Sequence, residues 1–374
     1  MKEVTMWTIS INNEWNILEE NFSWVRDMQN VPQDHRHHAE GNVAVHTQMV
    51  LEALTGLEAF QSLHEQEKEI LWASALLHDV EKRSVTVVEA DGSITAHGHA
   101  RKGAMTTRQL LYREVPTPFT IREQIVSLVR HHGLPLWMLE KPDPVKTLVK
   151  ASLEVDTRWL ALLARADALG RICQDREDLL YRIGCFEEFC KEHHCWAQPR
   201  PFTSNHARMY YLNQEHSSLD YAPFEISQTE VVLMSGLPGA GKDSYIRRHF
   251  PDRQVVSLDA LRVKMKIGPT DKSGNGRVIQ AAKEQARVLL RGGAPFVWNA
   301  TNITRSMRVQ LIELFRSYGA SVKIIYVESS YEQLIRQNKN REAVVPAQVL
   351  EKLIDKLEVP ALWEAEEVIY WTGQ

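Results

Sequence analysis

Histidine and aspartate residues recur along the first half of the chain in an order that suits a metal centre: His46, His78, Asp79, His99, His131 beside His132, and Asp167. A buried aspartate among histidines is costly unless it is paired, and a divalent cation pairs it. Imidazole and carboxylate ligands together suit Mn, Fe, Co, Ni or Zn. A lone histidine is more often a surface or hydrogen-bonded residue, but the whole series favours a transition-metal site.

A glycine-rich segment in the second half has the form of a phosphate-binding loop: Gly236, Gly239, Gly241, Lys242, Asp243 and Ser244 in the run GLPGAGKDS. Glycines allow backbone N–H groups to close around phosphate oxygens, and the following helix N-terminus favours the same anion. Lys242 is predicted to contact the β- and γ-phosphates of ATP or another NTP. Asp243 stands where serine or threonine is usual, so either Asp243 or Ser244 is expected to hold Mg²⁺.

A phosphate-binding loop alone does not distinguish an ATPase, a GTPase and a kinase, but polar residues downstream help to do so. Asp259 ends an apolar run and could accept the proton of an attacking hydroxyl, and Arg262 follows one helical turn later. The alternative for Asp259 is a helix N-cap. Arg336 and Arg341 lie near a predicted helix end and could close over a triphosphate, although a solvated charged helix end is the alternative.

The elements that position these residues divide the chain into two parts. Apolar residues at helical spacing predict helices at 43–56, 67–80, 121–130 and 151–172, and Asp91-Gly92 predicts a hairpin. After a proline-containing segment, apolar runs alternate with helical patterns, which predicts a parallel sheet. The predicted domains are 1–200, all-α; 201–227, a linker or docking segment; and 228–374, an α/β P-loop domain.

Composition supports globular domains, with 44% hydrophobic and 25% charged residues. The net charge of -4 is uneven, because residues up to Ser227 are acidic overall and the remainder is basic, which suits a phosphate-rich partner. Cys173, Cys185, Cys190 and Cys195 do not form CxxC pairs, so reduced thiols are favoured over a zinc site. Without a signal peptide or a long apolar run, a cytoplasmic protein with no membrane contact is expected.

Several local motifs resemble the HD phosphohydrolase superfamily. Residues His78 to Lys82 match HDxxK, residues 99–104 match HxxxGA, and the segments around His131 and Asp167 are similar to HD domains of bacterial tRNA nucleotidyltransferases. The resemblance covers residues 38–172. It implies one metal at His46, His78, Asp79 and Asp167, and a second at His99 and His131, with Asp79 bridging. His131 fits the family spacing better than His132. It also implies a phosphate contact for Lys82, and for His38 a phosphate contact or acid role, with a surface histidine as the alternative.

The second half resembles the 5′-OH polynucleotide kinases over about residues 230–360. The shared elements are the GxPGxGK loop, Asp259 with Arg262, Thr301-Asn302 at a strand end, and Arg336 and Arg341 before Val345-Pro346. The resemblance implies that Asp259 is the general base and that Arg262 contacts the 3′-phosphate of the acceptor's terminal nucleotide. The two later arginines would stabilise the transferred phosphoryl group.

Together, in this order, the halves are similar to bacterial HD-polynucleotide kinases, which heal nucleic-acid ends. The resemblance implies NTP- and Mg²⁺-dependent 5′-OH phosphorylation, and metal-dependent removal of a 2′-phosphate or opening of a 2′,3′-cyclic phosphate. RNA or DNA ends are the expected substrates, and an RNA ligase is a candidate partner. Two alternatives remain: an HD nucleotidase fused to a small-molecule kinase, and a nucleotide-gated regulatory or toxin-like protein.

Overall fold

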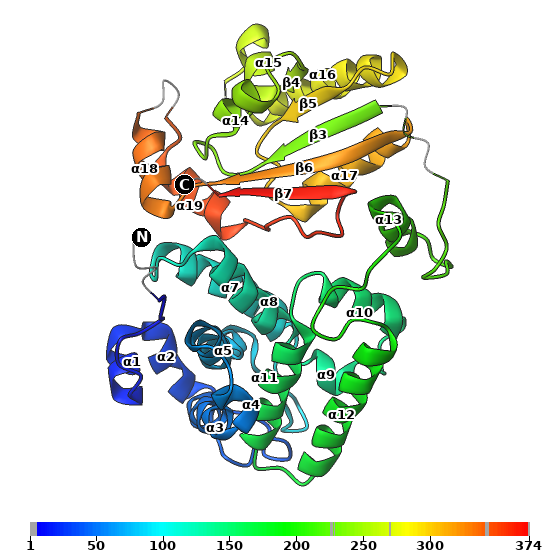
Figure 1. The fold of residues 1–374 in the computed structure, drawn as a ribbon. Coiled ribbons are helices and arrows are strands. Elements are labelled where there is room, and N and C mark those ends of the chain that lie inside the picture. Colours follow the sequence, from blue (N-terminus) through cyan, green and yellow to red (C-terminus); the bar gives the residue numbers. More distant parts are fainter. Residues whose placement is uncertain (1–5, 225–226, 228, 269–270, 341–343, 373–374) are drawn as a thin grey trace. The chain divides into compact units, whose positions relative to one another are not determined.

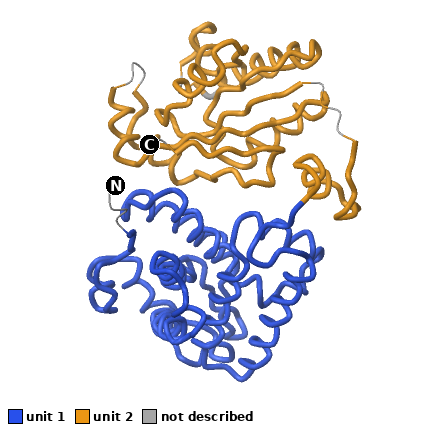
Figure 2. Tube along the Cα trace, viewed as in Figure 1, with its two compact units in different colours: residues 1–201 blue, residues 202–374 orange. Residues whose placement is uncertain are grey.

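The computed structural model describes residues 6–224, 227, 229–268, 271–340 and 344–372. The chain divides into two compact units, Met1–Pro201 and Phe202–Gln374 (Figure 2). The segment 201–227, expected to be a linker or docking segment, contains the helix α13 and begins the second unit. Within the described ranges, every helix is too short or too polar to cross a bilayer.

The first unit is almost entirely helical (Figure 1). One small antiparallel hairpin interrupts it, in which Val87 pairs with Thr95 across the turn at Asp91-Gly92, as predicted. Its elements are α1 (Trp15–Asn21), α2 (Ser23–Asp27), the 3₁₀ helix η1 (Met28–Asn30), α3 (Val43–Gly56), α4 (Glu58–Gln61), α5 (Glu65–Leu77), α6 (Lys82–Val85), β1 (Val87–Val88), β2 (Ile94–Thr95), α7 (His99–Arg113), α8 (Phe119–His131), α9 (Leu134–Trp137), α10 (Pro144–Ser152), α11 (Thr157–Leu169) and α12 (Arg176–Glu192).

Helices α3, α5, α8 and α11 form the centre of this unit. Helix α3 packs against α5 and α11, and α5 packs against α8. Helix α11 is buried along most of its length because it carries alanine and leucine on nearly every side. The single helix predicted for 151–172 is wrong: α10 ends at Ser152, and α11 starts anew because the Asp156 carboxylate accepts a hydrogen bond from the N–H of Arg158.

The second unit contains a five-stranded sheet with strand order β4-β5-β3-β6-β7 (Figure 1), and every strand pair in it is parallel. Its elements are α13 (Asn205–Asn213), β3 (Thr229–Ser235), α14 (Lys242–His249), β4 (Gln254–Ser257), α15 (Leu258–Met265), α16 (Lys272–Arg291), β5 (Phe296–Asn299), α17 (Arg305–Arg316), β6 (Ala320–Glu328), α18 (Tyr331–Lys339), α19 (Ala347–Asp355) and β7 (Glu367–Thr372). The predicted fold classes of both halves are therefore confirmed.

Strand β3 is central in this sheet, and its neighbours β5 and β6 carry continuous apolar runs because helices cover both faces. The carboxyl ends of β3, β4 and β5 meet at one edge of the sheet. The glycine-rich loop follows β3, Asp259 follows β4, and Asn299 ends β5. Parallel pairing thus gathers at one edge polar residues that are distant in sequence.

Candidate metal centre and phosphate-binding loop

Three histidines of the first unit are oriented by the same local device. Nδ1 of each ring contacts the backbone carbonyl three residues earlier: His78 contacts Ala75 O at 2.7 Å, and His99 and His132 contact Ala96 O and Val129 O at 2.8 Å. A carbonyl oxygen can only accept, so Nδ1 carries the proton in each ring. Nε2 is then left with a free lone pair, which is the form of histidine that binds metals.

A fourth histidine, His46 on α3, is held by a carboxylate instead. Its Nδ1 lies 2.9 Å from Oε1 of the buried Glu40, which also accepts from Nδ1 of His38 at 2.8 Å. Burial raises the pKa of Glu40, but the hydrogen bonds from His38 and His46 outweigh it and keep the pKa below its ordinary value. A carboxylate behind a histidine in this way fixes the ring and increases its basicity toward a metal.

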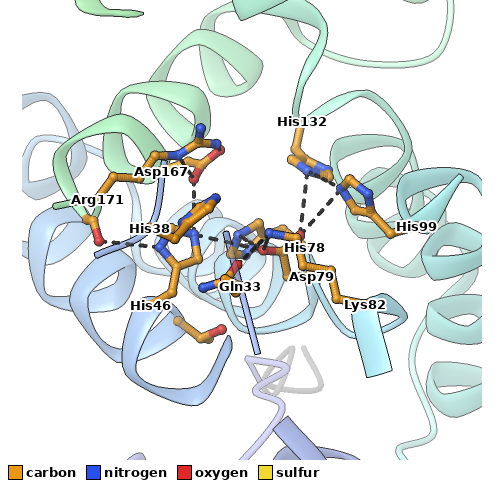
Figure 3. Close-up of polar contacts among 12 residues, drawn as sticks. Gln33, His38, His46, His78, Asp79, Lys82, His99, His132, Asp167 and Arg171 are labelled. Atoms are coloured by element: carbon orange, nitrogen blue, oxygen red, sulfur yellow. Dashed lines mark hydrogen bonds and ion pairs between the residues drawn. The ribbon is translucent and has the colours of Figure 1, made fainter. Parts of the chain in front are cut away.

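The free nitrogens converge on two buried carboxylates (Figure 3). Oδ2 of Asp79 lies 3.3 Å from Nε2 of His78, and its Oδ1 lies 3.4 Å from Nε2 of His99. Oδ1 of Asp167 lies 3.1 Å from Nε2 of His46. Asp79 belongs to both groups of metal-ligating atoms, one with His46 and His78 and the other with His99 and His132. This arrangement has the form of a two-ion centre with a shared aspartate.

Unsatisfied buried atoms indicate that these residues fit a cation. Nε2 of His46, Nε2 of His78 and Oδ1 of Asp79 are buried and have no hydrogen-bond partner in the described part of the chain. Nε2 of His99, whose side chain is 26% exposed, and Nε2 of the buried His132, both expected to carry lone pairs, lie only 3.2 Å apart. Two lone pairs that face one another at this distance are unfavourable, and a divalent cation between them would remove that cost.

Two basic side chains neutralise the carboxylates from the other side. Nζ of Lys82 lies 2.7 Å from Oδ2 of Asp79 and donates to Oε1 of Gln33 at 2.7 Å. Arg171 donates to both oxygens of Asp167, at 3.0 and 2.6 Å. Burial raises the pKa of each aspartate, but the positive charges of Lys82 and Arg171, with the nearby histidines, hold both well below the usual range. Both aspartates are therefore ionised, as metal ligands must be.

The centre opens into a cavity of about 660 Å³. Asp79, His99, His132 and Asp167 lie in its wall, and Lys82 and Arg171 stand beside them. The wall also includes Arg130, Trp137 and Lys141. A cavity that has a candidate metal centre and cationic side chains in its wall suits a phosphate ester.

The structure corrects one predicted ligand. His131 turns away from the centre, and its Nε2 lies 2.8 Å from Oε2 of Glu154, while the buried His132 faces His99 and Asp79. Consecutive residues near a helix end point about 100° apart, so only one of the two can face the centre. His132 therefore replaces His131 in the predicted ligand set.

His38 is not a surface histidine. It is buried, donates to Glu40 and lines the cavity. Burial lowers its pKa to about 4, although the hydrogen bond to Glu40 acts in the opposite direction. Gln33 and Arg171 were missed from the sequence, and Glu40 belongs to a motif that begins at His38 but has no predicted role. Arg171 could have been found, because it follows Asp167 by four residues and so lies on the same side of the helix end.

The glycine-rich loop joins β3 to α14 in the predicted way. Gly236, Gly239 and Gly241 all have positive φ angles, of 145°, 85° and 105°. A Cβ on Gly236 would lie 2.2 Å from the carbonyl oxygen of Val327, so only glycine fits there. Nζ of Lys242 donates to the carbonyls of Gly236 and Leu237, at 2.9 and 2.8 Å, and is therefore folded back over the loop.

Asp243 is tied to the end of a neighbouring strand. Its Oδ1 accepts a hydrogen bond of 2.7 Å from Nδ2 of Asn299, the last residue of β5. Asn302, which follows, is buried and donates to Met234 O at 2.7 Å, and Gly236 N donates to Thr301 O at 2.9 Å. The polar residues after β5 therefore brace the loop. Asn299 is the member of this group that contacts the residue expected near Mg²⁺.

Asp259 lies in the first turn of α15 and Arg262 in the last turn. The cap of this helix is Ser257, whose Oγ accepts from Ala260 N, so Asp259 is not the N-cap. The side chain of Asp259 is 77% exposed and forms an ion pair with Arg262, whose Nε also donates to Asn275 at 2.9 Å. An exposed carboxylate at the strand edge is accessible to an acceptor hydroxyl.

Ser244 and Arg336 are both exposed, Ser244 in the first turn of α14 and Arg336 in the last turn of α18. Arg341 lies outside the described residues. The predicted closure of the two arginines over a triphosphate therefore stays a prediction.

Two family models match separate parts of the chain. Residues 42–172 match the HD domain, and residues 231–360 match an AAA domain. Among solved structures, a protein from Chloroflexus aurantiacus designated a candidate kinase is 16% identical, with 39% of this chain and 86% of that one covered and a TM-score of 0.34. A sugar kinase from Janibacter is 18% identical, with 38% and 85% covered and a TM-score of 0.30. These structural similarities are too low to indicate a substrate.

Proposed function

The chain contains an HD domain and a P-loop kinase-like domain, and we propose that together they heal nucleic-acid ends. The second unit would phosphorylate a 5′-OH end with ATP or another NTP. The first would remove a 2′-phosphate or open a 2′,3′-cyclic phosphate at the other end. The observation that carries the proposal is the cluster of Asp79, Asp167 and four histidines at a cavity with basic side chains in its wall. The same chain contains a phosphate-binding loop and the ion pair of Asp259 with Arg262.

In the first unit, His46, His78, Asp79 and Asp167 would hold one divalent ion, and His99 and His132 the second, with Asp79 shared. Such ions would supply Lewis acidity toward a phosphoryl oxygen and make a water nucleophilic near neutral pH. Lys82 and Arg171 lie beside the carboxylates and would bind the phosphate oxygens and orient the ester. The Nδ1 contacts of the histidines keep the ligand rings fixed, so little reorganisation is needed on binding.

In the second unit, loop N–H groups and Lys242 would bind the β- and γ-phosphates, with Lys242 swinging away from the carbonyls that it now contacts. Asp243, positioned by Asn299, or Ser244 would contact Mg²⁺. Asp259 would accept the proton of the 5′-OH, and Arg262 would hold the adjacent phosphate. Arg336 and Arg341 are proposed to stabilise the transferred phosphoryl group. An RNA ligase could then join the healed ends.

The test uses one labelled RNA that carries a 5′-OH and a 2′,3′-cyclic phosphate, incubated with ATP, Mg²⁺ and Mn²⁺. Both ends are expected to change. Lys242→Ala should abolish 5′ phosphorylation alone, and Asp79→Ala should abolish 3′-end hydrolysis alone. If neither RNA end reacts while a nucleoside or a small phosphate ester does, the polymer assignment is overturned and the nucleotidase with a small-molecule kinase takes its place.

A further inference from the structure

A large aromatic side chain stands in the wall of the metal-centre cavity without a part in the proposed hydrolysis. Trp137, the last residue of α9, lines the cavity and is 42% exposed, while its neighbours Leu136 and Met138 are buried. Tryptophan has a large flat apolar surface with one polar end, and it is enriched where proteins bind other molecules. A ligand with a flat apolar surface would therefore suit this side chain.

The position of Trp137 is tied to the metal centre through a short piece of chain. It follows the ligand His132 by five residues, and a Cβ on Gly133 would lie 4.0 Å from Cδ1 of the indole. His132 and Gly133 form the turn between α8 and α9, so the ligand and the tryptophan lie on neighbouring short elements, and both line the same cavity.

One basic side chain packs on the ring. The guanidinium of Arg182 lies 4.9 Å from the indole centroid. Arg182 also forms ion pairs with Glu140 and Asp178, each at 2.7 Å. The contact of the cation with the aromatic ring favours one orientation of the indole. A ring that is already oriented loses less entropy when a ligand stacks on it.

Basic groups share the cavity with the ring. Lys82 and Arg171 contact the carboxylates of the metal centre, and Arg130 and Lys141 line the same cavity. The combination of a metal centre, basic groups and a flat aromatic surface in one cavity matches the parts of a nucleotide. A phosphate ester without a base would leave the indole unused.

We propose that Trp137 is a stacking platform for the base of the terminal nucleotide whose phosphate lies at the metal centre. The inference rests on the proposed phosphoesterase function of the first unit and adds its specificity: a nucleotide is preferred over a simple phosphate ester. Because every base has an aromatic face, the platform would favour RNA ends without strong sequence preference.

The test compares adenosine 2′-monophosphate with glycerol 2-phosphate, which has the phosphate but no ring. Trp137→Ala is expected to raise KM for the nucleotide about tenfold, within the range found for base–aromatic stacking, and to leave KM for glycerol 2-phosphate within about twofold. Trp137→Phe should keep most of the nucleotide preference. Leu139→Ala is the matched control, because Leu139 is 62% exposed nearby and is absent from the cavity wall.

Equal losses on both esters would overturn the inference in favour of a structural role, and an unchanged nucleotide KM would overturn it outright. If the wild-type protein loaded with Mn²⁺ hydrolyses neither ester, the proposed function fails instead. In that case, calorimetry measures the affinity for adenosine 2′-monophosphate directly and tests the role of Trp137 separately from hydrolysis. Weaker binding by Trp137→Ala than by the wild type supports stacking on the ring, and equal binding refutes it.

Discussion

At the residue scale, the metal centre depends on which nitrogen of each histidine is free. Backbone carbonyls occupy Nδ1 of His78, His99 and His132, and Glu40 occupies Nδ1 of His46. All four Nε2 atoms can therefore act as ligands without any change of tautomer. The same carboxylate that orients His46 also binds His38, so one buried Glu40 organises two rings at the edge of the centre.

Replacement of His132 should be far more damaging than replacement of His131. His132→Ala removes a ligand of the second ion and is expected to lower the phosphoesterase rate at least 100-fold, with a lower metal content by mass spectrometry. His131→Ala removes a half-buried partner of Glu154, outside the ligand set, and should change the rate by no more than a few-fold. If His131→Ala instead caused the larger loss of rate and of metal content, His131 would be the ligand.

Glu40→Gln tests the carboxylate behind His46. The amide keeps the size of the side chain but loses the charge, so metal affinity is expected to fall by about 10- to 100-fold. Competition with a metal indicator measures it. Glu52→Gln, an exposed position on α3, is the control and should bind metal as the wild type does. An unchanged affinity in Glu40→Gln would show that the carboxylate does not support the ligand.

At the element scale, each centre is built where separate elements end or cross. The ligands of the first unit come from α3, the end of α5, the start of α7, the end of α8 and α11, so the helix packing itself sets their distances. In the second unit, the ends of β3, β4 and β5 lie along one sheet edge, and hydrogen bonds from the residues after β5 hold the phosphate-binding loop. Changes to these junctions should affect both stability and activity.

Gly236→Ala is expected to abolish kinase activity and lower the melting temperature of the second unit. The added Cβ would meet the Val327 carbonyl at 2.2 Å, in a conformation that alanine rarely adopts. Gly276→Ala is the matched control: it lies inside α16 with nothing within 4 Å and should be neutral or stabilising by up to ~1 kcal/mol. Normal phosphorylation by Gly236→Ala would contradict the assigned role of the loop.

At the scale of the whole molecule, the two units are expected to be stabilised by different interactions. The first buries several candidate ligand atoms that have no hydrogen-bond partner in the part of the chain that the structure describes, so a bound metal ion is expected to increase its stability. The second has an apolar core between its sheet and its helices. Ligand binding stabilises only the unit that binds it, by about 2.7 kcal/mol at a hundredfold excess over Kd. The two units are therefore expected to respond separately to metal and nucleotide.

Chelation should lower the melting temperature of the first unit only. Removal of the ions leaves Nε2 of His46, Nε2 of His78 and Oδ1 of Asp79 buried without a hydrogen-bond partner among the described residues. A drop of about 5–10 °C is expected from the magnitudes of metal binding. Differential scanning calorimetry with and without Mn²⁺ measures it, and Asp79→Asn should lose the response. ATP with Mg²⁺ identifies the melting transition of the second unit, because it should stabilise that unit. If chelation also lowered the temperature of this transition, the two units would not respond separately.

The sequence by itself determined the phosphate-binding loop, the alternation of strands and helices after residue 228, and most of the His and Asp series. These features are local: a glycine run between an apolar strand and a helix has few ways to fold, and periodicity reports burial directly. Only the tertiary structure decided that His132 rather than His131 faces Asp79, that Glu40 supports His46, and that Asn299 contacts Asp243. The rotation of a helix about its own axis, and the meeting of residues distant along the chain, are set by packing, which spacing along one chain does not record.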